Sequence, residues 1–348
     1  MLRRLRLIFF LHCFLGGIRI LAAVIRPGIL GTGSFLPAKV LSNRDLEKMV
    51  DTSDEWIVTR TGISERRVVE PNIASSDLAI QAARKALDSA GVKPDKLDLI
   101  IVTTITPDMF FPATACLVQN ALGAKNAGAF DLMAACSGFV YGLSNAASMI
   151  SSGAVKKVLV VGAETLSKIT NYEDRSSCIL FGDGAGAVVL GPSSKHTIAY
   201  TKLGADGSGG DMMKLPAGGS RMPATEQTVR DKLHFMELRG REVFKFAVIK
   251  MQELIQDALD AGGYSASDIS FIVPHQVNLR ILAAAAEKCG VPMDKVLVNI
   301  DRYGNTSSAS IPIALDEAVR AKKLKKGDVV ILVAFGAGLT WASALIEW

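Results

Sequence analysis

Cysteines are few in this sequence, and their spacing excludes two common uses. The five are odd in number, never form a Cys-x-x-Cys pair, and lie at Cys13, Cys116, Cys136, Cys178 and Cys289. This spacing predicts neither a disulfide framework nor a zinc site. A chain of 348 residues buries a large core without cross-links. We therefore expect reduced thiols in a cytoplasmic protein, with at least one of them available as a nucleophile.

The N-terminus lacks an apolar run long enough to span a membrane. Its apolar stretch, Leu7 to Ile18, is shorter than the roughly 20 residues that a spanning helix needs. The arginines before it resemble the charged head of a secretory signal. We expect residues 1–26 to be a leader outside the fold, with no membrane span. An upstream start site or a disordered amphipathic leader is favoured over a working export signal.

The body of the chain has no excess of either charge. The net charge is +5, but Arg3, Arg4, Arg6 and Arg19 supply four of these charges, with no acidic residue before Pro27, and the remaining 35 basic residues face 34 acidic ones. No block of basic and aromatic residues of the kind that tracks phosphates is present. The sequence therefore predicts no nucleic-acid partner.

The glycine-rich segments do not match nucleotide-binding loops. Gly31 to Gly33 lacks the third glycine of a dinucleotide fingerprint. Phe181 to Ala187 and Ala334 to Trp348 lack the lysine spacing of a phosphate loop. These segments favour tight turns and an oxyanion site over nucleotide hydrolysis or hydride transfer.

What the sequence does contain is an internal repeat. The helical ending Ala86 to Gly91 returns at Ala258 to Gly263, an offset of 172 residues, and valine-rich runs further along share this offset. Because helix and strand patterns share one offset, the chain has duplicated halves. Each half alternates helices with continuous apolar runs, which is typical of an α/β fold with mostly parallel sheets. We expect one half over 27–194 and another over 195–348, packed about a pseudo-twofold axis.

Three side chains are predicted to meet at the junction of the halves. The offset sends Cys136 to Ser308, beside Asn305, and sends His275 to Thr103. All lie at strand ends or at strand-to-helix turns, where α/β sheets tend to bind ligands. Taken singly, each residue has an ordinary explanation, as a buried thiol, a structural histidine or a turn asparagine. Together they predict a nucleophile with two polar partners.

The position of Cys136 predicts a reactive thiol. A strand-like segment precedes it, small residues surround it, and a helical pattern follows from Gly138. Unpaired amides and the dipole at a helix N-terminus favour a thiolate, so we expect the pKa of Cys136 to be lowered.

At this point the motifs resemble a family. The segments are "GTGSFLP", "DTSDEWIVTRTGISERR", "AACSGF", "FGDGAGA", "VPHQVNLRI", "RYGNTSSAS" and "FGAGLTWASAL". In order and spacing they are similar to β-ketoacyl-acyl carrier protein synthase III, the initiating condensing enzyme of the thiolase fold. The resemblance runs from about Pro27 to Trp348. It implies two mixed sheets sandwiched between helices in an α-β-α-β-α arrangement.

The resemblance also implies the chemistry. Cys136 matches the nucleophile that takes an acyl group, with acetyl as the expected primer, from acyl-coenzyme A. His275 and Asn305 match the pair that helps decarboxylate malonyl-acyl carrier protein, and the amides of Cys136 and Ala337 match the oxyanion donors. No metal or redox cofactor is implied.

Binding residues follow from the same resemblance. Those for coenzyme A are Trp56, Arg60, Thr61, Arg175 and Asn278. Those for the acyl pocket are Phe111, Phe335 and Leu339, with Phe111 reaching into a partner subunit, so a homodimer is implied. Those for acyl carrier protein are Gln276, Val277, Asn278, Leu279, Arg280 and Lys245, with Lys288 at the edge of the patch.

Some departures and alternatives stay open. Glu287 stands where some members have a lysine before Lys288, and Leu339 replaces a common aromatic residue. A related Cys-His-Asn enzyme that primes a polyketide or quinolone pathway with a longer acyl group is the nearest alternative. Thiolases are disfavoured because no cysteine follows Cys289. A non-catalytic partner subunit is disfavoured because all three reactive residues are present.

Overall fold

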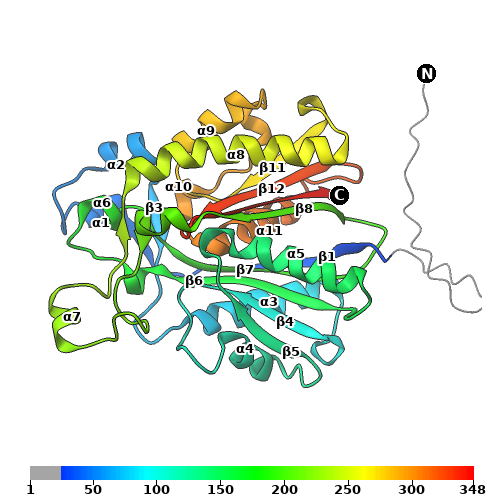
Figure 1. The fold of residues 1–348 in the computed structure, drawn as a ribbon, viewed down its shortest axis with the longest axis horizontal. Coiled ribbons are helices and arrows are strands. Elements are labelled where there is room, and N and C mark those ends of the chain that lie inside the picture. Colours follow the sequence, from blue (N-terminus) through cyan, green and yellow to red (C-terminus); the bar gives the residue numbers. More distant parts are fainter. Residues whose placement is uncertain (1–24) are drawn as a thin grey trace, which may run out of the picture.

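The computed structural model describes residues 25–348 (Figure 1). The predicted leader, residues 1–26 with Cys13, lies outside the described residues except for positions 25 and 26. Among the residues described, no helix is long and apolar enough to cross a membrane.

The core of the fold is one mixed sheet of nine strands in the order β11-β12-β13-β8-β1-β7-β6-β4-β5. The first half supplies β1 (Pro27–Phe35), β4 (Leu99–Thr103), β5 (Gly128–Leu132), β6 (Val158–Thr165) and β7 (Asp183–Pro192). The second half supplies β8 (Thr197–Ala205), β11 (Ile269–Pro274), β12 (Val329–Gly336) and β13 (Thr340–Glu347). The two expected half-sheets are continuous through a single residue pair, Gly28 with Thr197. The predicted boundary at residue 194 falls between β7 and β8 and stays a prediction.

Helices cover both half-sheets and also separate them, as Figure 1 shows. The outer helices are α3 (Ser75–Ala90) and α4 (Thr114–Leu122) on the first half, and α8 (Gly240–Gly262) and α9 (Leu279–Lys288) on the second. The inner helices are α5 (Gly138–Ser151) and α11 (Ser310–Arg320). One apolar cluster surrounds the inner helices, and two more lie under the outer ones. The layered α-β-α-β-α prediction is therefore confirmed.

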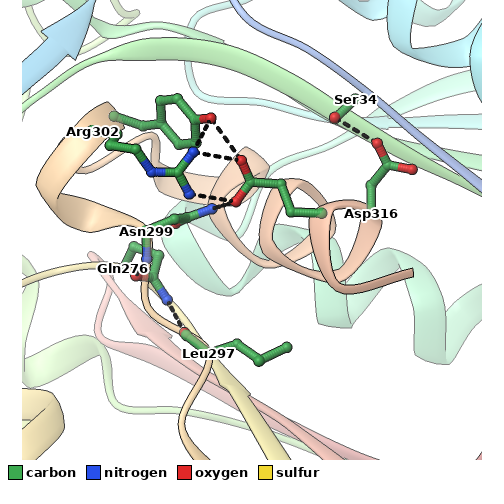
Figure 2. Close-up of polar contacts among 8 residues, drawn as sticks. Ser34, Gln276, Leu297, Asn299, Arg302 and Asp316 are labelled. Carbon is green, nitrogen blue, oxygen red and sulfur yellow. Dashed lines mark hydrogen bonds and ion pairs between the residues drawn. The ribbon is translucent and has the colours of Figure 1, made fainter. Parts of the chain in front are cut away.

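Short elements fill the loops. They are the strand pair β2 (Val40–Ser42) and β3 (Glu65–Arg67), the pair β9 (Met213–Lys214) and β10 (Glu237–Leu238), and the helices α1 (Asn43–Leu46), α2 (Asp54–Thr61), α6 (Arg175–Cys178), α7 (Glu226–Arg230) and α10 (Ile300–Tyr303). Asp316 of α11 binds β1 directly, because its carboxylate accepts from Thr32 at 2.8 Å and also from Ser34 at 2.6 Å. Figure 2 shows the second of these contacts. The inner layer is thereby fixed to the first half of the sheet.

The repeat is visible in the backbone itself. The 3₁₀ turns η2 (Ala135–Ser137) and η7 (Ser307–Ala309) lie 172 residues apart, and each precedes an inner helix. Ala135 and Ser307, the matching residues of these turns, both have φ of 47°. Few L-residues adopt this left-handed region. The sequence-based prediction of duplicated halves agrees with this geometry.

Candidate active site

Cys136 lies in η2, between β5 and α5, and is only 6% exposed. The end of β12 approaches its backbone closely. A Cβ added to Gly336 would lie 2.6 Å from the Cys136 nitrogen, which is shorter than any real carbon contact. Glycine is therefore required at residue 336 for the second half to reach the nucleophile turn.

Burial dominates the acidity of the Cys136 thiol. It raises the pKa of Cys136 to about 12, and the nearby Glu164 carboxyl adds to the rise. The prediction of a lowered pKa is wrong for this structure, because loss of water around the sulfur outweighs the helix N-terminus. At neutral pH the resting residue is a thiol, so a base must take its proton.

His275 follows β11 at the junction of the halves and is 1% exposed. Its backbone nitrogen donates to Val333 O at 2.8 Å, and its ring meets Phe335 edge-on with centroids 5.8 Å apart. Its Nδ1 lies 2.8 Å from Ser310 Oγ. Burial lowers the pKa of His275 to about 3, so the ring is neutral at physiological pH.

Asn305 lies between α10 and η7 and is 4% exposed. Its backbone nitrogen donates to Leu180 O at 2.8 Å, and its backbone oxygen accepts from Gly182 N at 3.0 Å. Its Oδ1 accepts from Ser307 N at 2.8 Å. Because Oδ1 is held in this way, Nδ2 is the part of the side chain that can donate to a ligand.

A continuous set of contacts joins the three residues. Phe335 contacts the His275 ring, and the next residue along β12, Gly336, contacts Cys136. Ser310 bonds both His275 and Ser307 O, while Ser307 N bonds Asn305. The structure thus places these three residues, from both halves, in one connected set of contacts, and their catalytic roles stay predictions.

The structure contradicts the prediction that Gln276 contacts a carrier protein. Gln276 is 1% exposed, and its Nε2 donates to Pro274 O at 3.0 Å and to Leu297 O at 2.9 Å (Figure 2). Its Oε1 accepts from Asn299 N at 3.0 Å. A side chain with every polar atom bonded inside the protein has nothing to offer a docking partner. Gln276 instead holds the turn that follows His275.

Figure 2 shows that this turn continues into a charged network on the way to Asn305. Asn299 Nδ2 donates to Glu317 Oε2 at 2.9 Å, and Arg302 donates to both oxygens of Glu317, at 3.0 and 2.9 Å. Tyr303 OH donates to Glu317 Oε1 at 2.6 Å. The network fixes α10, and with it the start of the Asn305 turn.

The predicted coenzyme A residues form a second group around Trp56. The Cζ atoms of Arg60 and Arg175 lie 4.7 and 5.3 Å from the Trp56 ring centroid. No base fits between Trp56 and a guanidinium at these distances, so adenine would displace Arg175, which also donates to Asp51 O at 2.9 Å. Thr61 differs from the others: it is buried, and its hydroxyl donates to Ile57 O at 2.7 Å.

The start of α9 joins this group to the remaining predicted residues. Asn278 caps α9 by accepting from Arg280 N at 2.9 Å, and it donates to Arg60 O at 2.9 Å. Val277 and Leu279 are half-buried in packing contacts. The side chains that face solvent are Arg280, Lys245 and Lys288. These cations are the part of the predicted carrier surface that a partner can reach.

The predicted acyl-pocket residues separate into two groups. Phe335 and Leu339 are buried beside the site, and Ala337 lies between them at the end of β12. Phe111 is 85% exposed, and its neighbour Phe110 is also exposed. Phe111 therefore does not line a pocket of its own chain.

Three buried polar residues of the site were missed from the sequence. Glu164 is the second-last residue of β6, and its Oε1 lies 2.9 Å from Ser308 Oγ. Ser310 contacts His275, and the buried Ser307 hydroxyl lies beside the Cys136 thiol, where it partly offsets the rise in the pKa of that thiol. The repeat offered a signal for Glu164, because the offset of 172 residues makes it the counterpart of Gly336 in the other half. Ser307 and Ser310 lie within the motif "RYGNTSSAS", but neither was given a role from the sequence.

Comparisons with known proteins agree with this geometry. Family models described as 3-oxoacyl-[acyl-carrier-protein (ACP)] synthase III match residues 130–207 and, for the C terminal part, 259–348. The chain is 57% identical over 325 residues to the β-ketoacyl-[acyl-carrier-protein] synthase III of Caldanaerobacter subterraneus, covering 93% of this chain and 98% of that one.

Solved structures show the same likeness. The 3-oxoacyl-[acyl-carrier-protein] synthase III of Aquifex aeolicus is 49% identical with a TM-score of 0.86, over 92% of this chain and 100% of that one. The priming β-ketosynthase of the R1128 polyketide pathway is 38% identical with a TM-score of 0.87, over 95% and 98%.

The fold, the buried cysteine and these relatives define a ketosynthase, an acyl-transferring condensing enzyme. Within that class, the chain belongs to the β-ketoacyl-acyl carrier protein synthase III family, which initiates fatty-acid synthesis. The resemblance predicted from the motifs is confirmed.

Proposed function

We propose that this enzyme transfers an acyl group, preferably acetyl, from coenzyme A to Cys136 and then condenses it with malonyl-acyl carrier protein. The observation that carries the proposal is the burial of Cys136, His275 and Asn305 within one connected set of contacts at the junction of the halves. A water-poor site strengthens electrostatic stabilisation of a developing oxyanion and keeps the thioester from hydrolysis.

In the first half-reaction the Cys136 sulfur attacks the acyl carbonyl. A new S–C bond forms, the bond from that carbon to the coenzyme A sulfur breaks, and free coenzyme A leaves. The backbone amides of Cys136 and Ala337 are proposed to donate to the oxyanion. Removal of one such donor typically costs about 3 to 4 kcal/mol of transition-state stabilisation.

In the second half-reaction malonyl-acyl carrier protein loses CO2. The electron pair of the broken C–C bond forms an enolate, whose oxygen is stabilised by His275 and by Nδ2 of Asn305. The enolate carbon attacks the acyl-Cys136 carbonyl and releases 3-oxoacyl-carrier protein and the Cys136 thiolate. Decarboxylation itself supplies the electron pair, so the proposed route needs no metal or redox cofactor.

Two surfaces are proposed to bind the substrates. Trp56 and Arg175, with Arg60 beside them, would take the adenine after Arg175 moves from its place on the indole. Arg280 and Lys245 project from neighbouring helices and would attract the acidic carrier protein. Asn278 lies between these groups, which supports a single entry path to the active site for coenzyme A and for acyl carrier protein.

We also propose a cytoplasmic homodimer. Met109, Phe110 and Phe111 are three consecutive exposed apolar residues, which favours their burial against a second copy. In such a dimer Phe111 would reach the partner's acyl pocket. Free thiols at every cysteine that the structure describes support a reducing compartment. A sedimentation mass equal to one chain would exclude the dimer.

The alternative substrate is a longer primer for a polyketide or quinolone pathway. The likeness to the R1128 priming ketosynthase supports this alternative. A panel of acyl-coenzyme A primers with malonyl-carrier protein, read by product mass, separates the two. Preference for acetyl supports the main proposal, and preference for a long chain supports the alternative.

The proposal is tested most directly with Cys136→Ala and radiolabelled acetyl-coenzyme A. We expect no label on the variant protein, while some decarboxylation of malonyl-carrier protein persists because His275 and Asn305 remain. Label retained on the variant would exclude Cys136 as the nucleophile.

The carrier surface is tested with Arg280→Glu. We expect the reaction with malonyl-carrier protein to weaken by about tenfold, with acyl loading from coenzyme A nearly unchanged. Lys288→Glu, at the far end of α9, is the matched control and should have the smaller effect. Equal losses in both half-reactions would remove the docking role.

A further inference from the structure

We propose that Ser310 is a positioning residue that holds resting His275 in the Nδ1–H tautomer, with Nε2 bare toward Cys136. The two side chains are 2% and 1% exposed, so water does not compete for their bond. His275 Nδ1 and Ser310 Oγ are 2.8 Å apart, and Ser310 Oγ is also 2.8 Å from Ser307 O. The consequences for catalysis rest on the proposed function above.

Counting protons decides the tautomer. A serine hydroxyl has one hydrogen, and the Ser307 carbonyl oxygen can only accept. If that hydrogen goes to Ser307 O, the Ser310 oxygen accepts from Nδ1–H and both contacts are hydrogen bonds. If it goes to His275 Nδ1 instead, the contact with Ser307 O is no longer a hydrogen bond from this hydroxyl. The first arrangement makes one more bond in a site closed to water.

The repeat shows that Ser310 is placed for His275. The matching pair in the first half is Thr103 and Gly138, and a Cβ on Gly138 would lie 3.2 Å from Thr103 Cβ. The two positions are therefore adjacent in both halves. Only the second half has an imidazole at one position and a hydroxyl at the other.

The tautomer sets the order of the two roles of His275. Bare Nε2 takes the proton of the Cys136 thiol as the sulfur forms its bond to the acyl carbon. It then gives this proton to the departing coenzyme A thiolate, so the ring ends neutral. Donation to the enolate oxygen in the condensation uses the Nε2–H tautomer, in which the Ser310 hydroxyl donates to Nδ1. When condensation breaks the C–S bond, the Cys136 thiolate takes a proton from solvent, and the ring returns to the Nδ1–H tautomer.

The tautomer can be read directly by NMR of the full chain labelled with 15N-histidine, with His275→Gln used for assignment. In the wild type we expect a protonated Nδ1 and an unprotonated Nε2. Ser310→Ala should shift the population toward Nε2–H. Ser343→Ala is the matched control, because Ser343 is buried and its hydroxyl has no partner among the described residues. A wild-type Nε2–H ring, or an unchanged tautomer in Ser310→Ala, would overturn the proposal.

A kinetic measurement separates this inference from the proposed function. We expect Ser310→Ala to slow acetyl loading of Cys136 by about 10²-fold without weakening coenzyme A binding, and Ser310→Thr to restore the rate. Unchanged loading in Ser310→Ala would contradict the positioning role. Failure of the wild type to take label would instead sink the proposed function, while the NMR result stands independently of activity.

Discussion

The turn at Cys136 and the matching turn at Ser308 share one backbone and differ in what surrounds them. Both follow a residue with φ of 47° and precede an inner helix. Ser308 Oγ lies 2.7 Å from Thr103 O and 2.9 Å from Glu164 Oε1, so its one hydroxyl hydrogen is shared between two acceptors inside the protein. Cys136 instead packs its backbone against Gly336, next to Phe335, which contacts the His275 ring. The comparison shows that neighbouring side chains, and not the backbone turn, distinguish a site from a structural contact.

The largest difference between the turns is the residue opposite each. Gly336 stands opposite Cys136, and Glu164 stands opposite Ser308. Glu164 also accepts from Thr106 Oγ1 at 2.8 Å and Ile105 N at 3.1 Å, and burial raises its pKa. The turn at Ser308 thus packs against a carboxyl side chain, and the turn at Cys136 packs against the bare backbone of a glycine.

Of the three variants Gly336→Ala, Glu164→Ala and His275→Thr, the first should have the largest effect, and it changes the turn at Cys136. The new Cβ would meet the Cys136 nitrogen, so the nucleophile turn must move, and a displacement of about 1 Å can cost about 100-fold in rate. We expect a loss of that size in acetyl loading, measured by single-turnover labelling. Gly207→Ala is the control, because an added Cβ there meets nothing within 4 Å. Equal rates in the two variants would mean that the close approach has no catalytic importance.

Glu164→Ala tests the turn at Ser308. Removal of the carboxyl leaves the buried donors Thr106 Oγ1 and Ile105 N without this acceptor and takes away one of the two acceptors of Ser308. We expect the free energy of unfolding to fall by about 3 kcal/mol, measured by urea denaturation. Glu253→Ala removes an exposed carboxylate paired with Lys250 and should change it by less than about 1 kcal/mol. Comparable changes would show that Glu164 adds little to stability.

His275→Thr copies the matching residue, Thr103, into the active turn. Of the three variants, it should change the free energy of unfolding least near neutral pH. Burial lowers the pKa of His275 from its ordinary 6.5 to about 3. Between these pH values the unfolded chain binds a proton that the folded chain does not, so stability falls as the pH drops from about 6.5 toward 3. Threonine cannot titrate, so the variant should lose less stability on acidification. Parallel stability curves for variant and wild type would contradict the lowered pKa.

Much of the site was predictable because the repeat and the motifs are local. The offset of 172 placed Cys136 opposite Ser308 from the sequence, and the structure keeps that register. The burial of individual side chains could not be predicted from the local sequence. A glutamine in a docking motif looks available until Pro274 O, Leu297 O and Asn299 N are found to bond it. The Cys136 thiol likewise looked acidic until its loss of water was known.

The sequence by itself determined the duplicated α/β architecture, the family and the identity of the reactive residues, since periodicity and motif order are written along the chain. Only the tertiary structure decided which polar groups are bonded internally, how acidic Cys136 and His275 are, and which hydroxyl contacts the imidazole. Those properties depend on solvent exclusion and on distances between segments far apart in sequence, and no local pattern encodes either.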